Sequence, residues 1–188
     1  MVESGQKRVV VLVGPKHSGK SSVGRALARL AHTTLFDLDD LIRKRTGKSP
    51  RELYLESPEH FRTEEAAAAR QLAQQAEENK PGTFIIAAGG GLSDNPEALE
   101  TLSVVGRLVY LEVSAETAWN RIAISAAKNG ELPPFLRSEN PQETHRVLHE
   151  KRALAYSARA DIRVDAGTGR PKEIASRLFY ELKLDNRA

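Results

Sequence analysis

Apolar residues follow two alternating patterns along this chain. Short runs rich in branched apolar residues are typical of buried strands, whereas segments with an apolar residue every three or four positions are typical of helices that cover a core. The strand-like runs are Val9–Val13, Thr34–Asp37, Thr83–Ala88, Arg107–Glu112 and Asp161–Asp165. The helix-like segments are residues 22–30, 39–46, 59–79, 96–103, 115–128, 141–159 and 171–184. The pattern therefore predicts strands separated by helices.

This alternation predicts an α/β fold. Strands that alternate with helices require right-handed crossovers, which give a parallel sheet covered by helices on both faces. In such sheets ligands bind beyond the carboxyl ends of the strands, so the residues that follow each strand are the first candidates for a site. A chain of 188 residues has the length of one domain with its own core, and we expect residues 1–188 to form a single domain.

Composition and charge restrict the possible ligands and location. The 28 basic residues are intermixed with 25 acidic ones, giving a net charge of +3. Because the basic residues form no stripe with aromatic residues, we expect small anions rather than nucleic acid as ligands. The apolar run near the amino end is about five residues long, too short for a membrane span or a signal segment. The chain has no cysteine for a thiolate site. We expect a cytoplasmic monomer that does not bind membranes.

Residues 14–21 read GPKHSGKS and match the pattern G-x-x-x-x-G-K-[ST] of nucleotide phosphate-binding loops. A predicted strand enters this loop and a predicted helix leaves it, so backbone N–H groups and the positive end of a helix dipole surround one anion. Lys20 can reach the β- and γ-phosphates, and the Ser21 hydroxyl can join the shell of a Mg²⁺ ion. The alternative, a glycine turn that only joins two elements, leaves the lysine and the hydroxyl unexplained. The residues expected to contact ATP are Gly14, Pro15, Lys16, His17, Ser18, Gly19, Lys20, Ser21 and Ser22.

Three aspartates follow the second predicted strand. Asp37 and Asp39 alternate along the end of this strand and therefore face the same side of the expected crevice. One carboxylate near the phosphates can hold a Mg²⁺-bound water, and another can accept a proton from an acceptor hydroxyl. The alternative role is an N-cap of the next helix, which we expect for Asp40 and which stays open for the other two.

Two segments contain candidate ligands for a second substrate. Gly89, Gly90 and Gly91 follow the third predicted strand, where they either bring backbone N–H groups close to a ligand or form a flexible turn. Arg62, near the start of a long helix, can bind a carboxylate bidentately, with Glu65 as the partner that orients it. The alternative for Arg62 and Glu65 is a solvated ion pair on the helix surface.

Three further patterns carry weaker signals. Arg152 and Tyr156 share one helix face, where one could hold an anion while the other packs. His145 and His149 are one helical turn apart, but no third ligand has a suitable spacing, so we expect a surface pair rather than a metal site. The alanine cluster 66–69 is expected on a helix surface.

Together these segments resemble the shikimate kinase family. The resemblance runs collinearly from Arg8 to about Leu182 and includes D-x-D, F-R-x-x-E, G-G-G and R-x-x-x-Y in this order, a combination far more specific than the phosphate loop alone. It implies a three-layer fold like that of P-loop nucleoside monophosphate kinases, with a five-stranded parallel sheet of order 2-3-1-4-5. It also implies transfer of the γ-phosphoryl group of ATP, with Mg²⁺, to the 3-hydroxyl of shikimate in the pathway to aromatic amino acids.

The same resemblance assigns roles to residues. In this family Lys20 and Ser21 would serve the phosphates and magnesium, and Asp37 would touch the metal through water. The residues that would hold the hydroxyls and the carboxylate of shikimate are Asp39, Arg62, Gly89, Gly90, Gly91 and Arg152. Lys20, Asp39 and Asp37 would thus be the catalytic residues.

The expected lid, approximately residues 125–140, departs from the family that the chain resembles. That family carries a lid arginine in a pattern like R-P-L-L, and the matching stretch here is P-P-F-L at residues 133–136. An arginine supplied to a phosphoryl-transfer transition state contributes on the order of 10³–10⁵ in rate. Arg137, Arg121 and Lys16 are candidates to replace it, and we expect Arg137 to do so.

Several functions stay open on the sequence alone. The substrate-side motifs favour a shikimate kinase, whereas the altered lid suggests a kinase-fold module that binds nucleotide and a shikimate-like acid with little or no phosphoryl transfer. A kinase for another polyol acid, such as gluconate, is a third hypothesis, although Arg62 together with the glycine turn favours a cyclic carboxylate. We also expect Arg170 to lie against the adenine.

Overall fold

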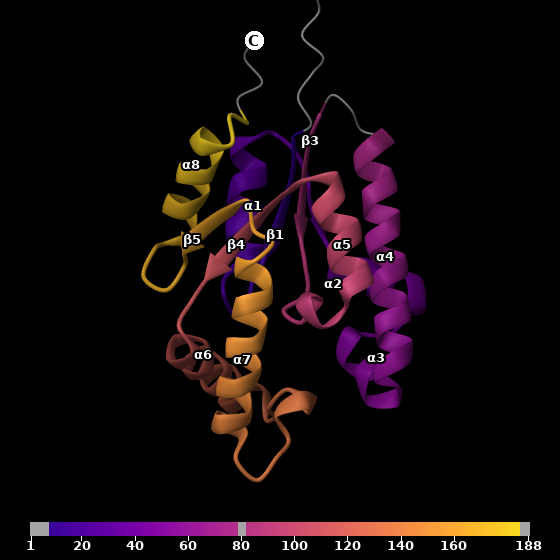
Figure 1. The fold of residues 1–188 in the computed structure, drawn as a ribbon, viewed down its shortest axis with the longest axis vertical. Helices are drawn as coiled ribbons and strands as arrows, with labels where there is room; N and C mark the ends of the chain where they lie inside the picture. The colour runs from indigo at the N-terminus through magenta and orange to yellow at the C-terminus, as the bar shows by residue number, and fades with distance from the viewer. Residues whose placement is uncertain (1–7, 79–81, 185–188) are drawn as a thin grey trace, which may run out of the picture.

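A parallel sheet forms the centre of the protein in the computed structural model, which describes residues 8–78 and 82–184 (Figure 1). The strands are β1 (Arg8–Val13), β2 (Leu35–Asp37), β3 (Thr83–Ala87), β4 (Arg107–Glu112) and β5 (Ile162–Asp165). Their order across the sheet is β2-β3-β1-β4-β5, and all neighbouring pairs are parallel. The predicted fold and the predicted strand order are confirmed.

The central strand β1 is buried on both faces. Side chains alternate along a strand, so Val9, Val11 and Val13 contribute to one hydrophobic cluster, whereas Val10 and Leu12 contribute to another on the opposite face. A continuous apolar run is therefore what this position in a parallel sheet requires.

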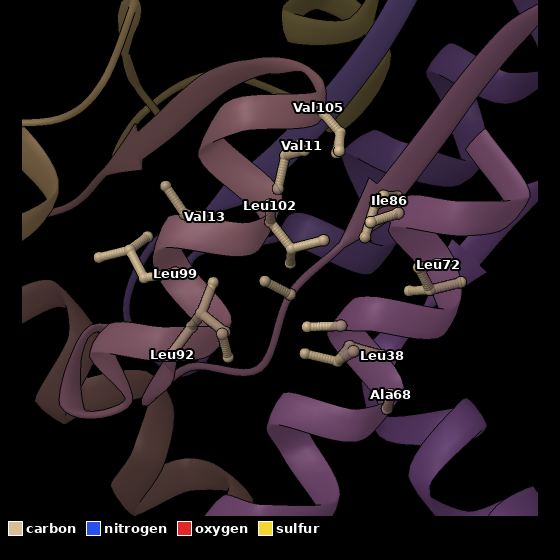
Figure 2. Packing of buried hydrophobic residues seen from close by; sticks show 14 of the residues in the cluster. Val11, Val13, Leu38, Ala68, Leu72, Ile86, Leu92, Leu99, Leu102 and Val105 are labelled. Atoms are coloured by element: carbon tan, nitrogen blue, oxygen red, sulfur yellow. The ribbon is translucent and has the colours of Figure 1, made fainter. Parts of the chain in front are cut away.

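Helices cover both faces of the sheet (Figure 1). The helices are α1 (Lys20–Leu30), α2 (Leu38–Thr46), α3 (Pro50–Glu56), α4 (Pro58–Glu78), α5 (Pro96–Val105), α6 (Ala115–Asn129), α7 (Pro141–Ser157) and α8 (Pro171–Glu181). Residues of α1 and α8 fill the cluster around Val10. Residues of α2, α4 and α5 fill the cluster around Val11, and Figure 2 shows this packing.

The alanine cluster of α4 lies in the core. Ala66, Ala68 and Ala69 are buried, so the prediction of a surface feature is wrong. Helix α4 packs along α5, and small side chains allow the two helices to approach closely.

Three short elements were not predicted: α3 and the 3-10 turns η1 (Leu92–Asp94) and η2 (Pro134–Leu136). Helix α3 begins with a capping box in which Ser49 accepts from the backbone N–H of Glu52 and the Glu52 side chain accepts from that of Ser49. Pro50 occupies the first helical position. The sequence Ser-Pro-x-Glu is a known helix start, so this signal was present. The bounds of the predicted helices differ by a few residues, most at α8, which ends at Glu181 rather than at residue 184.

The segment that contains α6, η2 and the start of α7 lies beyond one edge of the sheet, at the bottom of Figure 1. Because the strands are parallel, their carboxyl ends meet at one edge.

In the described part of the chain, no helix combines the length and the hydropathy that a bilayer span needs.

Candidate active site

A cavity of about 430 Å³ contains most of the predicted site residues. Those that line it are Lys16, His17, Gly19, Lys20, Ser21, Ser22, Asp37, Asp39, Arg62, Gly89, Gly90, Gly91 and Arg152. They come from the phosphate loop after β1, the start of α2, the turn after β3, and helices α4 and α7. The fold thus brings five distant segments together around one space.

The start of α1 presents unpaired backbone N–H groups to this cavity. Gly19 is its N-cap residue, has a φ of 97°, and gives no side-chain cap to the helix. This left-handed conformation is costly for residues with a Cβ atom. Because no side chain in the described part of the chain caps the helix, its first N–H groups and the positive end of its dipole are available to bind an anion.

Lys20 folds back over the loop. Its Nζ donates to the carbonyl oxygens of Gly14 at 2.9 Å and Pro15 at 2.8 Å, and burial lowers its pKa to about 8. Gly14, Pro15 and Ser18 of this loop are buried and are not among the residues that line the cavity. The ammonium is therefore held beside the anion site by the loop itself.

Ser21 and Asp37 connect the starts of two helices. The Ser21 hydroxyl donates to Oδ2 of Asp37 at 3.0 Å, and Oδ1 of Asp37 accepts from the backbone N–H of Asp39 at 3.0 Å. Asp37 is the N-cap of α2, so the expectation that Asp40 caps this helix is wrong. Asp40 instead forms an exposed ion pair with Arg43 at 2.7 Å.

The oxygen pair of Ser21 and Asp37 fits Mg²⁺, which prefers hard oxygen ligands. Among the described residues, no cluster of three or more histidine, cysteine, aspartate or glutamate side chains could hold a metal ion by itself. A cation held by few protein oxygens would take its remaining ligands from phosphates and water, which is the usual arrangement for Mg²⁺.

Asp39 lies against the glycine turn. A Cβ atom on Gly89 would stand 3.0 Å from Oδ1 of Asp39 and 3.3 Å from Oε1 of Glu65. Because Gly89 has no side chain, the carboxylates of Asp39 and Glu65 can both lie close to its backbone, on the same wall of the cavity. Burial raises the pKa of Asp39, Asp37 raises it further, and Lys20 opposes these two effects.

Glu65 is a buried part of this wall rather than a surface partner of Arg62. Its side chain is almost inaccessible, at 1% exposure, and its Oε2 accepts from Nδ2 of Asn95 at 3.0 Å. The same amide nitrogen donates to the backbone oxygen of Arg62 at 2.9 Å. No ion pair joins Arg62 and Glu65 within the described residues, so the proposed pairing is not formed. Burial raises the pKa of Glu65 to about 7.

This raised pKa predicts a pH-dependent stability. Between the ordinary pKa of 4.5 and about 7, the unfolded chain loses the Glu65 proton before the folded chain does. The free energy of unfolding therefore falls as the pH rises through this window, by on the order of 3 kcal/mol, and the loss is complete above it. Glu65→Gln keeps an oxygen that can accept from Asn95, but the glutamine side chain does not titrate. We expect its stability, measured by urea unfolding at several pH values, to exceed that of the parent increasingly from pH 4.5 to 7.

Glu59→Gln, on the exposed start of the same helix, is the control and should follow the parent protein at each pH. Parallel curves for the parent and Glu65→Gln would contradict the prediction.

Arg152 and Tyr156 of α7 support the glycine turn from the other side. Nε and Nη2 of Arg152 donate to Oδ2 of Asp94 at 3.1 and 2.6 Å. The buried hydroxyl of Tyr156 accepts from the backbone N–H of Ser93 at 3.1 Å and donates to the carbonyl of Gly90 at 3.5 Å. The four-residue spacing places Arg152 and Tyr156 on one face of α7, where Tyr156 holds the backbone of the turn and Asp94 holds Arg152 beside it.

Three arginines with proposed roles lie elsewhere in this conformation. Arg137 is 54% exposed and pairs with Glu131 at 2.8 Å, and Arg170 is 86% exposed at the start of α8. Neither lines the cavity. Arg121 donates to the carbonyl oxygens of His17 at 3.0 Å and Gly167 at 2.9 Å. The structure therefore does not bring the expected Arg137 to the phosphate loop.

Residues not singled out from the sequence also line the cavity. They are Pro50, Arg51, Tyr54, Ala88 and Asp94. Phe61, Glu65 and the lid residues Pro133, Pro134 and Phe135 line the cavity as well. Arg51 of α3 donates to the carbonyl oxygen of Leu132 at 3.3 Å and forms an ion pair with Glu131, so it joins α3 to the segment after α6. The guanidinium carbon of Arg152 lies 5.0 Å from the ring centre of Phe135, a cation–π distance. The capping box of α3 was the available signal for Arg51.

His145 and His149 are buried between α6 and α7, so the prediction of a surface pair is wrong. The ring of His145 lies 5.7 Å from that of Trp119 and 5.5 Å from that of His149, and Nε2 of His149 contacts the carbonyl oxygen of Val113 at 3.0 Å. Helix α7 packs on α6, which covers the histidine face. Burial lowers the pKa of both rings, that of His145 to about 4.

Comparisons with known proteins agree with this geometry. The family model for shikimate kinase matches residues 16–183. A shikimate kinase of Vibrio parahaemolyticus is 32% identical over 179 residues, which cover 95% of this chain and 98% of that protein. A structure described as shikimate kinase from Acinetobacter baumannii in complex with shikimate has a TM-score of 0.82 and 26% identity, and the match covers 98% of this chain and 97% of that one. The structure of the Aquifex aeolicus shikimate kinase has a TM-score of 0.71 and 28% identity, with 93% and 96% of the two chains covered. The chain therefore belongs to the shikimate kinase family.

Proposed function

We propose that this protein transfers the γ-phosphoryl group of ATP to the 3-hydroxyl of shikimate. The observation that carries the proposal is one cavity that joins a phosphate loop to Asp39, Arg62 and Arg152. The likeness to a kinase structure described as a complex with shikimate supports the choice of acid.

The phosphate loop is the proposed site for ATP. Backbone N–H groups at the start of α1 would hold the phosphate oxygens, and Lys20 would leave the carbonyl oxygens of Gly14 and Pro15 to bind the β- and γ-phosphates. Ser21 and Asp37 would hold Mg²⁺ directly or through water. When bound, this ion would neutralise negative charge on the β- and γ-phosphate oxygens.

The opposite wall is the proposed site for the acid. Arg62 and Arg152 would bind the carboxylate, and the backbone of Gly89–Gly91 would approach the ring closely. Asp39 would orient the 3-hydroxyl and accept its proton as the hydroxyl oxygen attacks the γ-phosphorus and the bond to the β–γ bridging oxygen breaks. Positioning and charge neutralisation would supply most of the catalysis.

We also propose that the chain is one kinase domain in which residues 125–140 act as a lid. Pro133, Pro134 and Phe135 line the cavity, and Arg51 ties the preceding residue, Leu132, to α3. A lid in this position could exclude water during transfer. A monomeric state and a cytoplasmic location stay predictions from the sequence.

A coupled ADP-release assay with Mg²⁺·ATP and a panel of hydroxylated acids tests the function. We expect ADP release with shikimate, none above background with gluconate, and a product whose mass is that of shikimate plus one phosphoryl group. Calorimetric binding of ATP and shikimate without ADP release would instead support the module without phosphoryl transfer. ADP release with gluconate but not with shikimate would instead favour a kinase for another polyol acid.

Arg62→Ala should mainly weaken acid binding. A bidentate, charge-assisted pair with a carboxylate is lost, so we expect the KM for shikimate to rise by roughly 10- to 100-fold while kcat changes much less. Arg70→Ala is the matched control on the same helix, because Arg70 is exposed, forms an ion pair with Glu97 and lies outside the cavity. Steady-state kinetics at varied shikimate concentration measure both. An unchanged KM in Arg62→Ala would remove Arg62 from the proposed acid site.

A further inference from the structure

The cavity is lined by five cationic side chains: Lys16, Lys20, Arg51, Arg62 and Arg152. Three of them are held by acceptors of the protein. Lys20 is bound to loop carbonyl oxygens, Arg51 to the segment after α6, and Arg152 to Asp94. Within the described residues, no hydrogen bond or ion pair holds the side chain of Lys16 or Arg62, and Arg62 is assigned to the acid above.

Lys16 lies where the nucleotide side and the acid side of the cavity meet. A Cβ atom on Gly90 would stand 2.8 Å from the backbone nitrogen of Lys16, so the phosphate loop and the glycine turn are in direct contact there. The exposed Lys16 side chain lines both the main cavity and an adjoining one of about 300 Å³. Partial desolvation of the ammonium lowers the pKa of Lys16, the charge of Asp39 opposes this effect, and that of Arg51 adds to it. The ammonium therefore shares its electrostatic environment with the proposed catalytic carboxylate.

Among the described residues, the segment after α6 contributes no charged side chain to the main cavity, and its Glu131 lines the adjoining one. The residues of η2 and its start that line the main cavity are Pro133, Pro134 and Phe135. Arg137 points to Glu131 instead. Phosphoryl transfer spreads negative charge over the oxygens of the moving group, and a cation placed there stabilises it. Of the two lysines of the phosphate loop, Lys16 is the one that no acceptor among the described residues holds, so it is free to take that position.

We propose that Lys16 is a further catalytic residue, whose ammonium contacts the transferring γ-phosphoryl group in the transition state. This inference rests on the proposed function. Lys16 donates hydrogen bonds to the equatorial oxygens and keeps its proton throughout, while the acceptor proton goes to Asp39. Lys20 then contacts the phosphoryl group from within the phosphate loop, and Lys16 contacts it from the side of the loop that faces the glycine turn.

The test compares Lys16→Met and Lys16→Arg in the full-length chain. We expect Lys16→Met to lower kcat by on the order of 100-fold, as for the loss of one preorganised donor, with much smaller changes in the KM values for ATP and shikimate. Lys16→Arg keeps the positive charge and should recover most of the lost kcat. Lys44→Met, an exposed residue of α2 outside the cavity, is the control and should match the parent protein.

A second measurement separates transition-state contact from a structural role. Calorimetry with ADP, shikimate and aluminium fluoride, a mimic of the transferring group, should show weaker ternary binding in Lys16→Met and unchanged binding of ADP alone. A kcat equal to the parent's in Lys16→Met overturns the inference and leaves the proposed function intact. If the parent protein itself forms no phosphorylated shikimate, the proposed function fails, and the role of Lys16 fails with it.

Discussion

Lys20→Met should reduce kcat for phosphoryl transfer by roughly 10³-fold or more, since it removes the buried cation of the phosphate loop. The ammonium is already held beside the anion site by the carbonyl oxygens of Gly14 and Pro15. Burial lowers its pKa to about 8, and phosphate oxygens would favour its charged form when nucleotide binds. Methionine retains most of the side-chain volume but neither the charge nor the donors. The ADP-release assay at saturating ATP and shikimate measures this loss.

Two controls show whether the loss concerns chemistry. The Tm of Lys20→Met and its affinity for shikimate should stay near those of the parent, because Arg62 and Arg152, the proposed ligands of the carboxylate, lie on α4 and α7 rather than on the phosphate loop. Lys44→Met should keep full activity, since its side chain is exposed on α2. A Lys20→Met protein that is folded and turns over at the parent rate would contradict the assignment of this loop to phosphate binding.

Asp39→Asn is expected to lower kcat by roughly 10²–10⁴-fold, the usual contribution of a general base. The amide fills the same space against Gly89 but cannot take the proton of the acceptor hydroxyl. Burial and the neighbouring Asp37 raise the pKa of Asp39 above its ordinary 3.8. Because the base must be ionised to act, the kcat of the parent should fall on the acid side with an apparent pKa above 3.8. Kinetics from pH 4 to 8 test both the loss and the acid-side fall.

Asp40→Asn is the matched control for Asp39→Asn. Asp40 is the next residue, but its carboxylate is exposed and pairs with Arg43, so we expect activity and pH profile to remain those of the parent. An Asp39→Asn protein with parent-like kcat and the same acid-side fall would assign the proton transfer to another group.

Local patterns were sufficient for the phosphate loop and the sheet. The apolar, β-branched run Val9–Val13 is typical of a buried strand, and the glycines and Lys20 that follow it indicate a phosphate-binding loop at a helix start. The strand order came from the resemblance of the whole chain and is confirmed. Helix α3 was missed although its capping box is visible in the sequence, because its apolar residues are too few to show a helical period.

The surroundings of individual side chains were predicted less well. Glu65 has the same spacing from Arg62 that a surface ion pair would have, yet the packing of α4 against α5 buries it beside Asn95. His145 and His149 are spaced like an exposed pair, and α6 covers them. Helical spacing identifies which residues share a face, but not which element packs on that face.

The sequence by itself determined the chemistry that this protein carries: the phosphate loop, the paired aspartates, the glycine turn and the arginines. Only the tertiary structure decided which charges meet. It places Lys16 against the glycine turn, Asp39 and Glu65 on one wall, and Arg137 outside the cavity. Residue type and local spacing act over one or two turns of chain, whereas these juxtapositions depend on how helices far apart in sequence pack around the carboxyl edge of the sheet.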